Sequence, residues 1–471
     1  MDPYQLVTVT LSDIIFIILI YIFAVIYGKR ITAKKIKQEK YYKHFTRGLI
    51  IKISFAIIFC TVYMTAYLGD TLDYFVGICA MSNLFWESPA KYFEILFSSP
   101  RPEFLYYFSS QTGYPEYHMF IDSNTFFVNR FFSPLGIITG NSFLLSSIIV
   151  SVASYTGIWK LYTVFVKKFP EIQDKLAVAV LYFPSVLFWG SGILKDTIVI
   201  MALGWLVYSV DNIFVFKRFF KTGIIIILSV WIMIIVKAYV IVVFLPVALI
   251  WLFYDRVKQI KFAILRYFFF PFVMLLTFFM FSFIFSQLKG TLGEFGDVDS
   301  IIKKAKITQD DLIREEAYGK NYFNIGEIGD TPGSVIKLAP AAIIAGLYRP
   351  FIWEAGNIFI LISSLENLVL LYLTLLIFIR YKIIFPIRII GSNPFILGLI
   401  IFSVFMAFGI GLSTANFGAL VRYRIPITPV FLSCLFAVEY FCKIKKLSAV
   451  KKHEEIIGAG SDYDTLSLRV T

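Results

Sequence analysis

Long apolar runs recur along this 471-residue chain and limit what it can fold into more than any other feature. Each run is roughly 17–24 residues long, which suits a helix crossing about 30 Å of hydrocarbon. Hydrophobic residues make up 58% of the chain and charged residues 16%, and the mean hydropathy is +0.77. We therefore predict an all-α, polytopic transmembrane helical bundle. About eleven helices are expected, near 11–27, 48–68, 143–166, 174–191, 193–215, 222–236, 238–254, 263–285, 355–379, 395–412 and 425–442.

The basic residues predict how the chain is oriented. Lysines and arginines crowd residues 28–47, the loop after the first apolar run. If that loop is cytoplasmic, all the remaining basic loops and the basic tail at 443–471 are cytoplasmic too, as basic loops usually are in membrane proteins. The N-terminus is then external and the C-terminus cytoplasmic. The net charge of +13 is explained by these loops, so no nucleic-acid partner is expected.

This orientation divides the chain into three parts. Residues 1–47 comprise the external N-terminus, the first helix and the basic loop. Residues 48–442 form the membrane domain, and 443–471 form the cytoplasmic tail. Two long loops of the membrane domain lie outside, at 69–141 and 286–340, and the tail is expected to be disordered from Ser448.

Two charged residues interrupt apolar sequence in the stretch FPSVLFWGSGILKDT, residues 183–197. Lys195 and Asp196 are neighbours there, just after a turn of small residues. A charge inside the bilayer costs about 2.5–3.5 kcal/mol on insertion scales, and such residues usually serve a site. The stretch is predicted to join two helices, with a Lys/Asp pair at the rim of a cavity. The alternative is a hairpin whose ion pair is simply solvated.

Further cations fall at the outer ends of apolar runs, where topology does not require them. Clustered lysines and arginines suit a phosphate or diphosphate ligand. Alternatively, they anchor lipid headgroups. The set is Lys195, Lys237, Lys337, Arg349, Arg422 and Arg424, and each of them except Lys337 is a predicted substrate-binding residue.

Two carboxylates follow the second apolar run, Asp70 and Asp73 in GDTLDY. A carboxylate at a helix end that faces a cavity acts as a general base or a metal ligand. The alternative is a solvated helix end with Asp70 as its N-cap. His118, in the first external loop, is a further candidate for substrate binding.

The order of these features resembles the GT-C class of integral membrane glycosyltransferases, from Ile50 to about Arg424. GDTLDYF stands where those enzymes carry the catalytic aspartate of the first external loop. FPSVLFWGSGILKD and LYRPFIWEAGN also resemble stretches of bacterial membrane proteins encoded in surface-polysaccharide clusters. The chain departs from the class in its extra N-terminal part and in lacking a large soluble C-terminal domain and a clear second acidic metal-binding motif.

The resemblance implies transfer of a sugar from a polyprenyl-phosphate donor to a glycan or lipid acceptor at the outer face of the membrane. It also implies that this membrane is a bacterial inner (plasma) membrane. Asp70 or Asp73 would be the base, and lysines and arginines would stabilise the departing phosphate. The resemblance leaves a divalent cation, Mg²⁺ or Mn²⁺, open as a cofactor. The expected partners are the lipid-linked donor, the acceptor and membrane lipids.

Two other functions fit the same sequence. An O-antigen-type polymerase would use a similar donor but transfer a whole oligosaccharide. A transporter or flippase of lipid-linked saccharides would explain charges inside apolar runs, although the chain lacks the internal repeat common in transporters.

Overall fold

The structure, a computed structural model, describes residues 7–66, 69–98, 100–213, 219–258, 321–326, 328–329 and 332–467, with isolated positions between 272 and 310. Helices dominate this part of the chain, and its only β-type pairing is one isolated bridge, between Tyr322 and Asn416. The protein is therefore all-α over the residues described, and the apolar helices identify it as a membrane protein. The predicted span at 263–285 and most of the second external loop lie outside the described residues.

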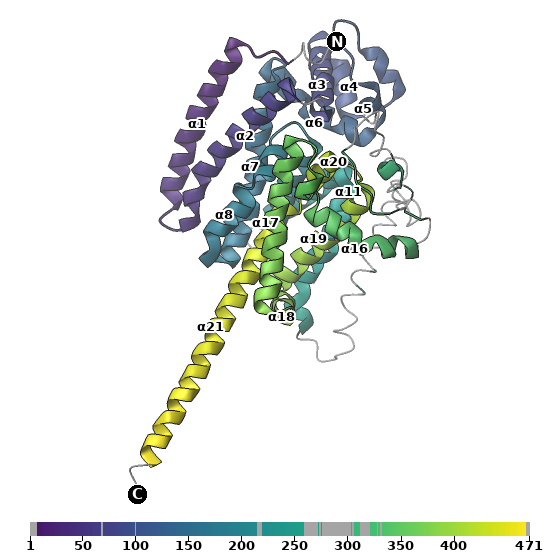
Figure 1. The fold of residues 1–471 in the computed structure, drawn as a ribbon. Coiled ribbons are helices and arrows are strands. Elements are labelled where there is room, and N and C mark those ends of the chain that lie inside the picture. The colour runs from purple at the N-terminus through teal and green to yellow at the C-terminus, as the bar shows by residue number, and fades with distance from the viewer. Residues whose placement is uncertain are drawn as a thin grey trace.

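The helices form one bundle (Figure 1). At one end of it, the short helices α3–α6 cover the tops of the longer ones, and at the other end α21 projects away from the bundle. The principal elements are α1 (Leu11–Lys35), α2 (Phe45–Thr65), α3 (Asp70–Glu87), α4 (Pro89–Phe97), α5 (Tyr117–Ile121), α6 (Ser123–Thr139), α7 (Phe143–Lys168), α8 (Gln173–Leu181), α9 (Pro184–Trp189), α10 (Lys195–Asn212), α11 (Phe219–Lys258), α16 (Pro332–Tyr348), α17 (Ile358–Tyr381), α18 (Ile384–Ser392), α19 (Pro394–Ser413), α20 (Phe417–Tyr423) and α21 (Thr428–Ser467).

The predicted count of about eleven spans is not confirmed. Six of the described helices are long and apolar enough to cross a membrane, or seven if the bent pair α20–α21 counts as one span. The run at 174–191 is divided between α8 and α9, because Pro184 begins a new helix after an extended Phe183. The segment 425–442 begins beyond a bend of 65° between α20 and α21. The tail continues α21 as a helix to Ser467, so the prediction of disorder from Ser448 is wrong as far as that residue.

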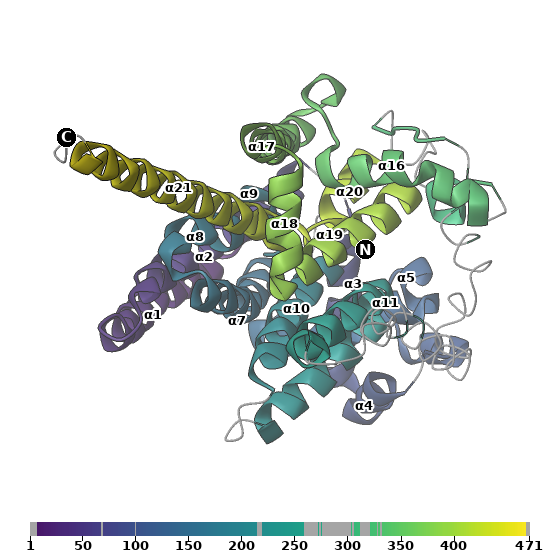
Figure 2. The ribbon, with the colours of Figure 1, turned by 90° about the horizontal axis from the view of Figure 1, so that it is seen from below.

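Small residues allow the central helices to touch. A Cβ atom on Gly157 of α7 would lie 2.1 Å from the carbonyl oxygen of Met201 in α10, and one on Gly204 would lie 2.0 Å from the carbonyl oxygen of Gly157. Such distances are far inside van der Waals contact, so the two backbones approach closely, as helices in membranes often do at small residues. Seen from below, α7, α10 and α11 occupy the middle of the bundle and α1 lies at its edge beyond α2 (Figure 2).

Helix α11 is broken at Lys237, whose backbone leaves the helical region with φ −152° and ψ 77°. Lys237 contacts Asp196 in the first turn of α10. Trp251 lies instead under the ammonium group of Lys168, which is 2.8 Å from Asp211 in the last turn of α10. The second half of α11 therefore runs parallel to α10, and the break brings Lys237 to the Asp70 end of the bundle.

Between α9 and α10 the chain is unwound but fully buried, at residues 190–194. Inside a membrane protein such backbone is tolerated only where its polar groups find partners. The Gly190 carbonyl accepts hydrogen bonds from Lys52 Nζ at 2.5 Å and Ser154 Oγ at 2.9 Å. The Ile193 carbonyl accepts one from Thr71 Oγ1 at 3.1 Å. Side chains of α2, α7 and α3 thus hold the unwound segment in place.

Candidate functional site

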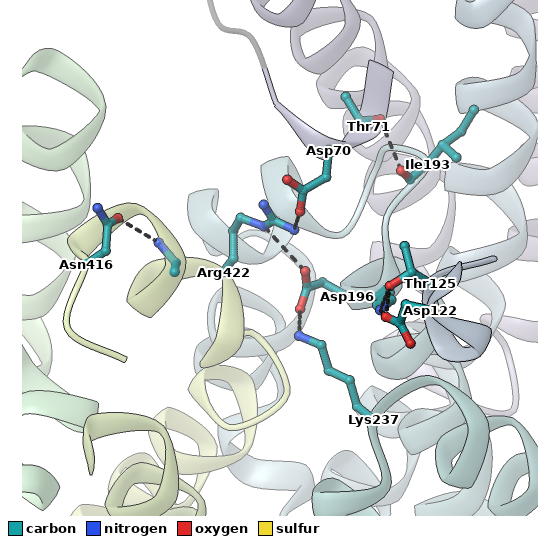
Figure 3. Close-up of polar contacts among 11 residues, drawn as sticks. Asp70, Thr71, Asp122, Thr125, Ile193, Asp196, Lys237, Asn416 and Arg422 are labelled. Atoms are coloured by element: carbon teal, nitrogen blue, oxygen red, sulfur yellow. Dashed lines mark hydrogen bonds and ion pairs between the residues drawn. The ribbon is translucent and has the colours of Figure 1, made fainter. Parts of the chain in front are cut away.

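Charged side chains from four separate elements meet at the end of the bundle covered by α3 and α6 (Figure 3). Asp70 begins α3, Asp196 lies in the first turn of α10, Lys237 lies at the break in α11, and Arg422 lies in the last turn of α20. They are up to 352 positions apart in the sequence, so the fold alone brings them together. We call these four residues the charged network.

Asp196 lies at the centre of the charged network. Its Oδ1 accepts a hydrogen bond from Lys237 Nζ at 2.5 Å, and its Oδ2 lies 3.6 Å from Arg422 Nε. The Nη2 group of Arg422 donates to Asp70 Oδ2 at 2.9 Å. Lys237 also lies 4.1 Å from the centre of the Tyr423 ring, a cation–π contact.

The members of the network differ sharply in exposure. The Asp196 side chain is 0% exposed and that of Lys237 is 7% exposed. Arg422 is 13% exposed, but Asp70 is 48% exposed. The alternative of a solvated ion pair at residues 195–196 is therefore wrong for Asp196. A ligand can therefore replace Asp70 as the partner of Arg422, because the displaced carboxylate stays in contact with solvent.

Helix ends favour these charges where they lie. Asp70 and Asp196 stand in first turns, where the partial positive charge of a helix N-terminus stabilises acids. Arg422 stands in a last turn, where the opposite end favours a base. Asp70 is the first residue of α3, and the N-cap position is held by Gly69, so the N-cap alternative is wrong.

Lys195 and Asp196 do not pair with one another, although they are neighbours in the chain. Lys195 Nζ bonds to Thr125 Oγ1 at 2.7 Å and lies 3.8 Å from Asp122 Oδ2. Both partners belong to the start of α6, and Thr125 also donates to Asp122. Since consecutive helical residues point about 100° apart, Lys195 faces α6 while Asp196 faces the charged network. The Asp122 side chain is 51% exposed, so this pair too opens to solvent.

Asp70 and Asp73 lie in different electrostatic surroundings. Desolvation alone would raise the pKa of Asp70, but the charge of Arg422 and its hydrogen bond outweigh this and hold the pKa below its usual value. The pKa of Asp73 is raised by desolvation and by the negative charges of Asp70 and Glu116, while His118 opposes the shift. Neighbouring carboxyl groups whose pKa values are pushed apart are typical of acid–base sites.

Three other predicted site residues lie apart from the network. Arg349 bonds to Glu354 at 2.7 Å and lies over the Phe323 ring. Arg424 is buried and donates from Nη1 to the Arg349 carbonyl oxygen at 2.8 Å. His118 is exposed on α5, on the side of Asp73. Arg349 and Arg424 therefore form a second group, and their proposed role as ligands of the same phosphate has no contact to support it.

A cavity of about 250 Å³ opens beside Arg422. Its walls come from the end of α2, from α9, from the start of α17 and from α20. The Trp189 ring lines the cavity and lies 5.9 Å from the guanidinium carbon of Arg422. The cavity and the charged network are therefore adjacent, and Trp189 borders both.

The sequence analysis missed two buried charges that the same reasoning could have found. Lys52 and Glu366 are the only charged residues in the predicted spans 48–68 and 355–379. Lys52 is fully buried against Gly190, and Glu366 accepts hydrogen bonds from the backbone nitrogen and hydroxyl of Ser185 at the start of α9. Both contacts fix the position of the segment that leads to Lys195. Charge inside an apolar run was the available signal.

Among the described residues, no three His, Cys, Asp or Glu side chains gather as ligands for a metal ion. The Mg²⁺ or Mn²⁺ left open by the sequence thus has no assigned ligand set in this part of the chain. No protein-family model, curated protein or solved structure matches the chain, so its function is inferred from the geometry of the site.

Proposed function

We propose that this protein is a membrane glycosyltransferase that moves a sugar from a polyprenyl-phosphate donor to an acceptor at the outer face of the bacterial inner membrane. The observation that carries the proposal is the convergence of Lys237 and Arg422 with Asp70 and Asp196 beside a cavity. Product on this side of the membrane would enter cell-surface polysaccharide or glycoconjugate.

The phosphate of the donor would bind Arg422 and Lys195. Both cations pair with carboxylates that are about half exposed, Asp70 and Asp122, and a phosphate can replace such partners at little cost in burial. Arginine binds phosphate with two parallel hydrogen bonds, and lysine adds a point charge. Lys237 stays with the buried Asp196 and holds it in place.

Asp73 would be the base. It takes the proton of the acceptor hydroxyl as that oxygen attacks the anomeric carbon, while the bond from that carbon to the phosphate oxygen breaks. Polyprenyl phosphate then leaves with the bonding electron pair, and its charge is stabilised by Arg422 and Lys195. A raised pKa makes Asp73 a stronger base than an ordinary aspartate, whereas Arg422 weakens Asp70 in that role.

Binding and transfer test this proposal separately. In nanodiscs, undecaprenyl phosphate should bind the wild type and bind Arg422→Lys and Lys195→Gln about tenfold more weakly, which is 1.4 kcal/mol. Lys337→Gln, an exposed cation on α16 outside the site, is the matched control. Equal affinity in all four proteins contradicts the phosphate role. Mass spectrometry of products from a synthetic polyprenyl-phosphate hexose then separates a single added sugar from a polymer ladder.

A transporter of lipid-linked saccharide is the second candidate. The unwound segment at 190–194 and the break at Lys237 both border the site, and interrupted helices at a binding site are common in transporters. Movement of the labelled lipid across liposomes without covalent change would favour the transporter over the transferase.

A further inference from the structure

The cavity beside Arg422 has the chemistry of a site for an uncharged ring. Among the residues that the structure describes, its lining contains no Asp, Glu, Lys, Arg or His, so no described side chain of its wall compensates the charge of a ligand. Aromatic side chains, among them Trp189 and Phe417, supply flat apolar faces, and three asparagines supply polar groups: Asn321, Asn357 and Asn416. Apolar walls with a few fixed polar groups are typical of small-molecule sites.

Two of these asparagines are held with their donors available. Asn357 Oδ1 caps α17 by accepting from the Ile360 backbone nitrogen at 2.9 Å. Asn416 Oδ1 caps α20 by accepting from the backbone nitrogens of Gly418 and Ala419 at 2.8 and 3.3 Å. Each cap fixes which end of the carboxamide is oxygen, and the Nδ2 of Asn416 lies on the other side of the group from its cap (Figure 3). Within the described part of the chain neither Nδ2 group has a hydrogen-bond partner.

The size and position of the cavity limit further which ligands can bind in it. A volume of about 250 Å³ is below the roughly 300–1,000 Å³ of sites for drug-sized ligands, so it suits one ring rather than an oligosaccharide. A glycosyl phosphate joins its ring to phosphorus through a single oxygen, which requires ring and phosphate subsites side by side. Trp189 provides that adjacency, because it lines the cavity and lies against Arg422.

We propose that this cavity binds the donor's sugar ring, and that the ring is a single uncharged monosaccharide rather than a uronic or other acidic sugar. This inference rests on the proposed function for the identity of the ligand as a donor. Ring hydroxyl and ring oxygen atoms accept hydrogen bonds from Nδ2 of Asn357 and Asn416, while Trp189 packs against an apolar face of the ring.

The test uses the full-length protein in nanodiscs and a panel of methyl glycosides: glucoside, galactoside, mannoside, rhamnoside, N-acetylglucosaminide and glucuronide. Saturation-transfer NMR measures their binding. Asn357→Asp and Asn416→Asp keep the helix caps, because Asp caps as well as Asn, but remove the Nδ2 donors. Asn393→Asp is the matched control, since Asn393 caps α19 away from this cavity. Asn416→Ser is an uncharged second variant that also caps well.

At least one neutral glycoside should bind, and the glucuronide should bind at least about fivefold more weakly. Both Asp variants and Asn416→Ser should weaken the neutral glycoside by about fivefold, and Asn393→Asp should not. Absence of binding by every neutral glycoside, equal binding of the glucuronide, or unchanged binding in the cavity variants overturns the inference. Specific glycoside binding without any sugar transfer would refute the proposed function and leave the cavity assignment standing. Sugar transfer that depends on Arg422, with an unchanged donor KM in the cavity variants, would refute the cavity assignment and leave the proposed function standing.

Discussion

Removing the carboxylate of Asp196 should destabilise the protein more than any other single change in the charged network. The Asp196→Asn variant leaves Lys237, whose side chain is 7% exposed, without a counter-charge; its remaining partners are the amide oxygen of the new side chain and the Tyr423 ring at 4.1 Å. An uncompensated buried charge of this kind costs about 3–5 kcal/mol. Lys237→Met should cost less, about 1–3 kcal/mol for a partner left unsatisfied, because Asp196 still faces Arg422 at 3.6 Å.

The double variant Asp196→Asn/Lys237→Met removes both charges, and Arg422 keeps Asp70 at 2.9 Å. Its cost should therefore fall short of the sum of the single costs by about 0.5–3 kcal/mol, the usual coupling of residues in contact. Equilibrium unfolding in bicelles, followed by tryptophan fluorescence, measures all three free energies. The exposed pair Lys43 and Asp174, 2.6 Å apart and 42% and 66% exposed, is the control and should couple by less than about 1 kcal/mol. Additive costs for Asp196 and Lys237, or coupling no larger than in the control, would refute the reasoning.

Three further predictions follow from other parts of the molecule. Gly157→Ala should destabilise the bundle by about 1–3 kcal/mol, because the added methyl group meets the Met201 carbonyl. Gly223→Ala, whose methyl group meets nothing within 4 Å, should instead increase the free energy of unfolding by about 0.5–1 kcal/mol. Equal effects of the two substitutions in the same unfolding assay would contradict the packing argument. If Asp73 is the base, sugar transfer should fail as pH falls through its raised pKa, and Glu116→Gln should move this acid limb to lower pH by removing a negative charge; a limb that does not move would count against Asp73. With the four native cysteines replaced, Tyr106→Cys should react with an impermeant maleimide in intact cells and Lys445→Cys only after permeabilisation; the opposite labelling would reverse the predicted orientation.

The sequence predicted the charged residues of the site better than it predicted their partners. Asp196 was recognisable because charge is costly inside an apolar run, and Lys237 and Arg422 because they lie at the outer ends of such runs, where topology does not require a cation. Their pairing was not, since Lys195 and Asp196 point to different neighbours and the residues they meet are tens to hundreds of positions away. The split of the run 174–191 into α8 and α9 was signalled only by Pro184, whose effect on the backbone hydropathy does not register.

The cavity was beyond the reach of the sequence for a different reason. Its walls come from helices that meet only in the folded chain, and its asparagines read as ordinary helix caps. A capping asparagine and a ligand-binding one have the same sequence pattern, because one end of the carboxamide serves the helix while the other remains available.

The unwound residues 190–194 connect the wall of the cavity at Trp189 directly to Lys195 and Asp196. Hydrogen bonds from Lys52, Ser154 and Thr71 fix this segment to α2, α7 and α3. A displacement of Trp189 must therefore also displace Asp196, and this changes the contact between Asp196 and Arg422. Binding of the sugar ring in the cavity and binding of the phosphate at Arg422 would then be coupled through the protein as well as through the covalent bond of the ligand.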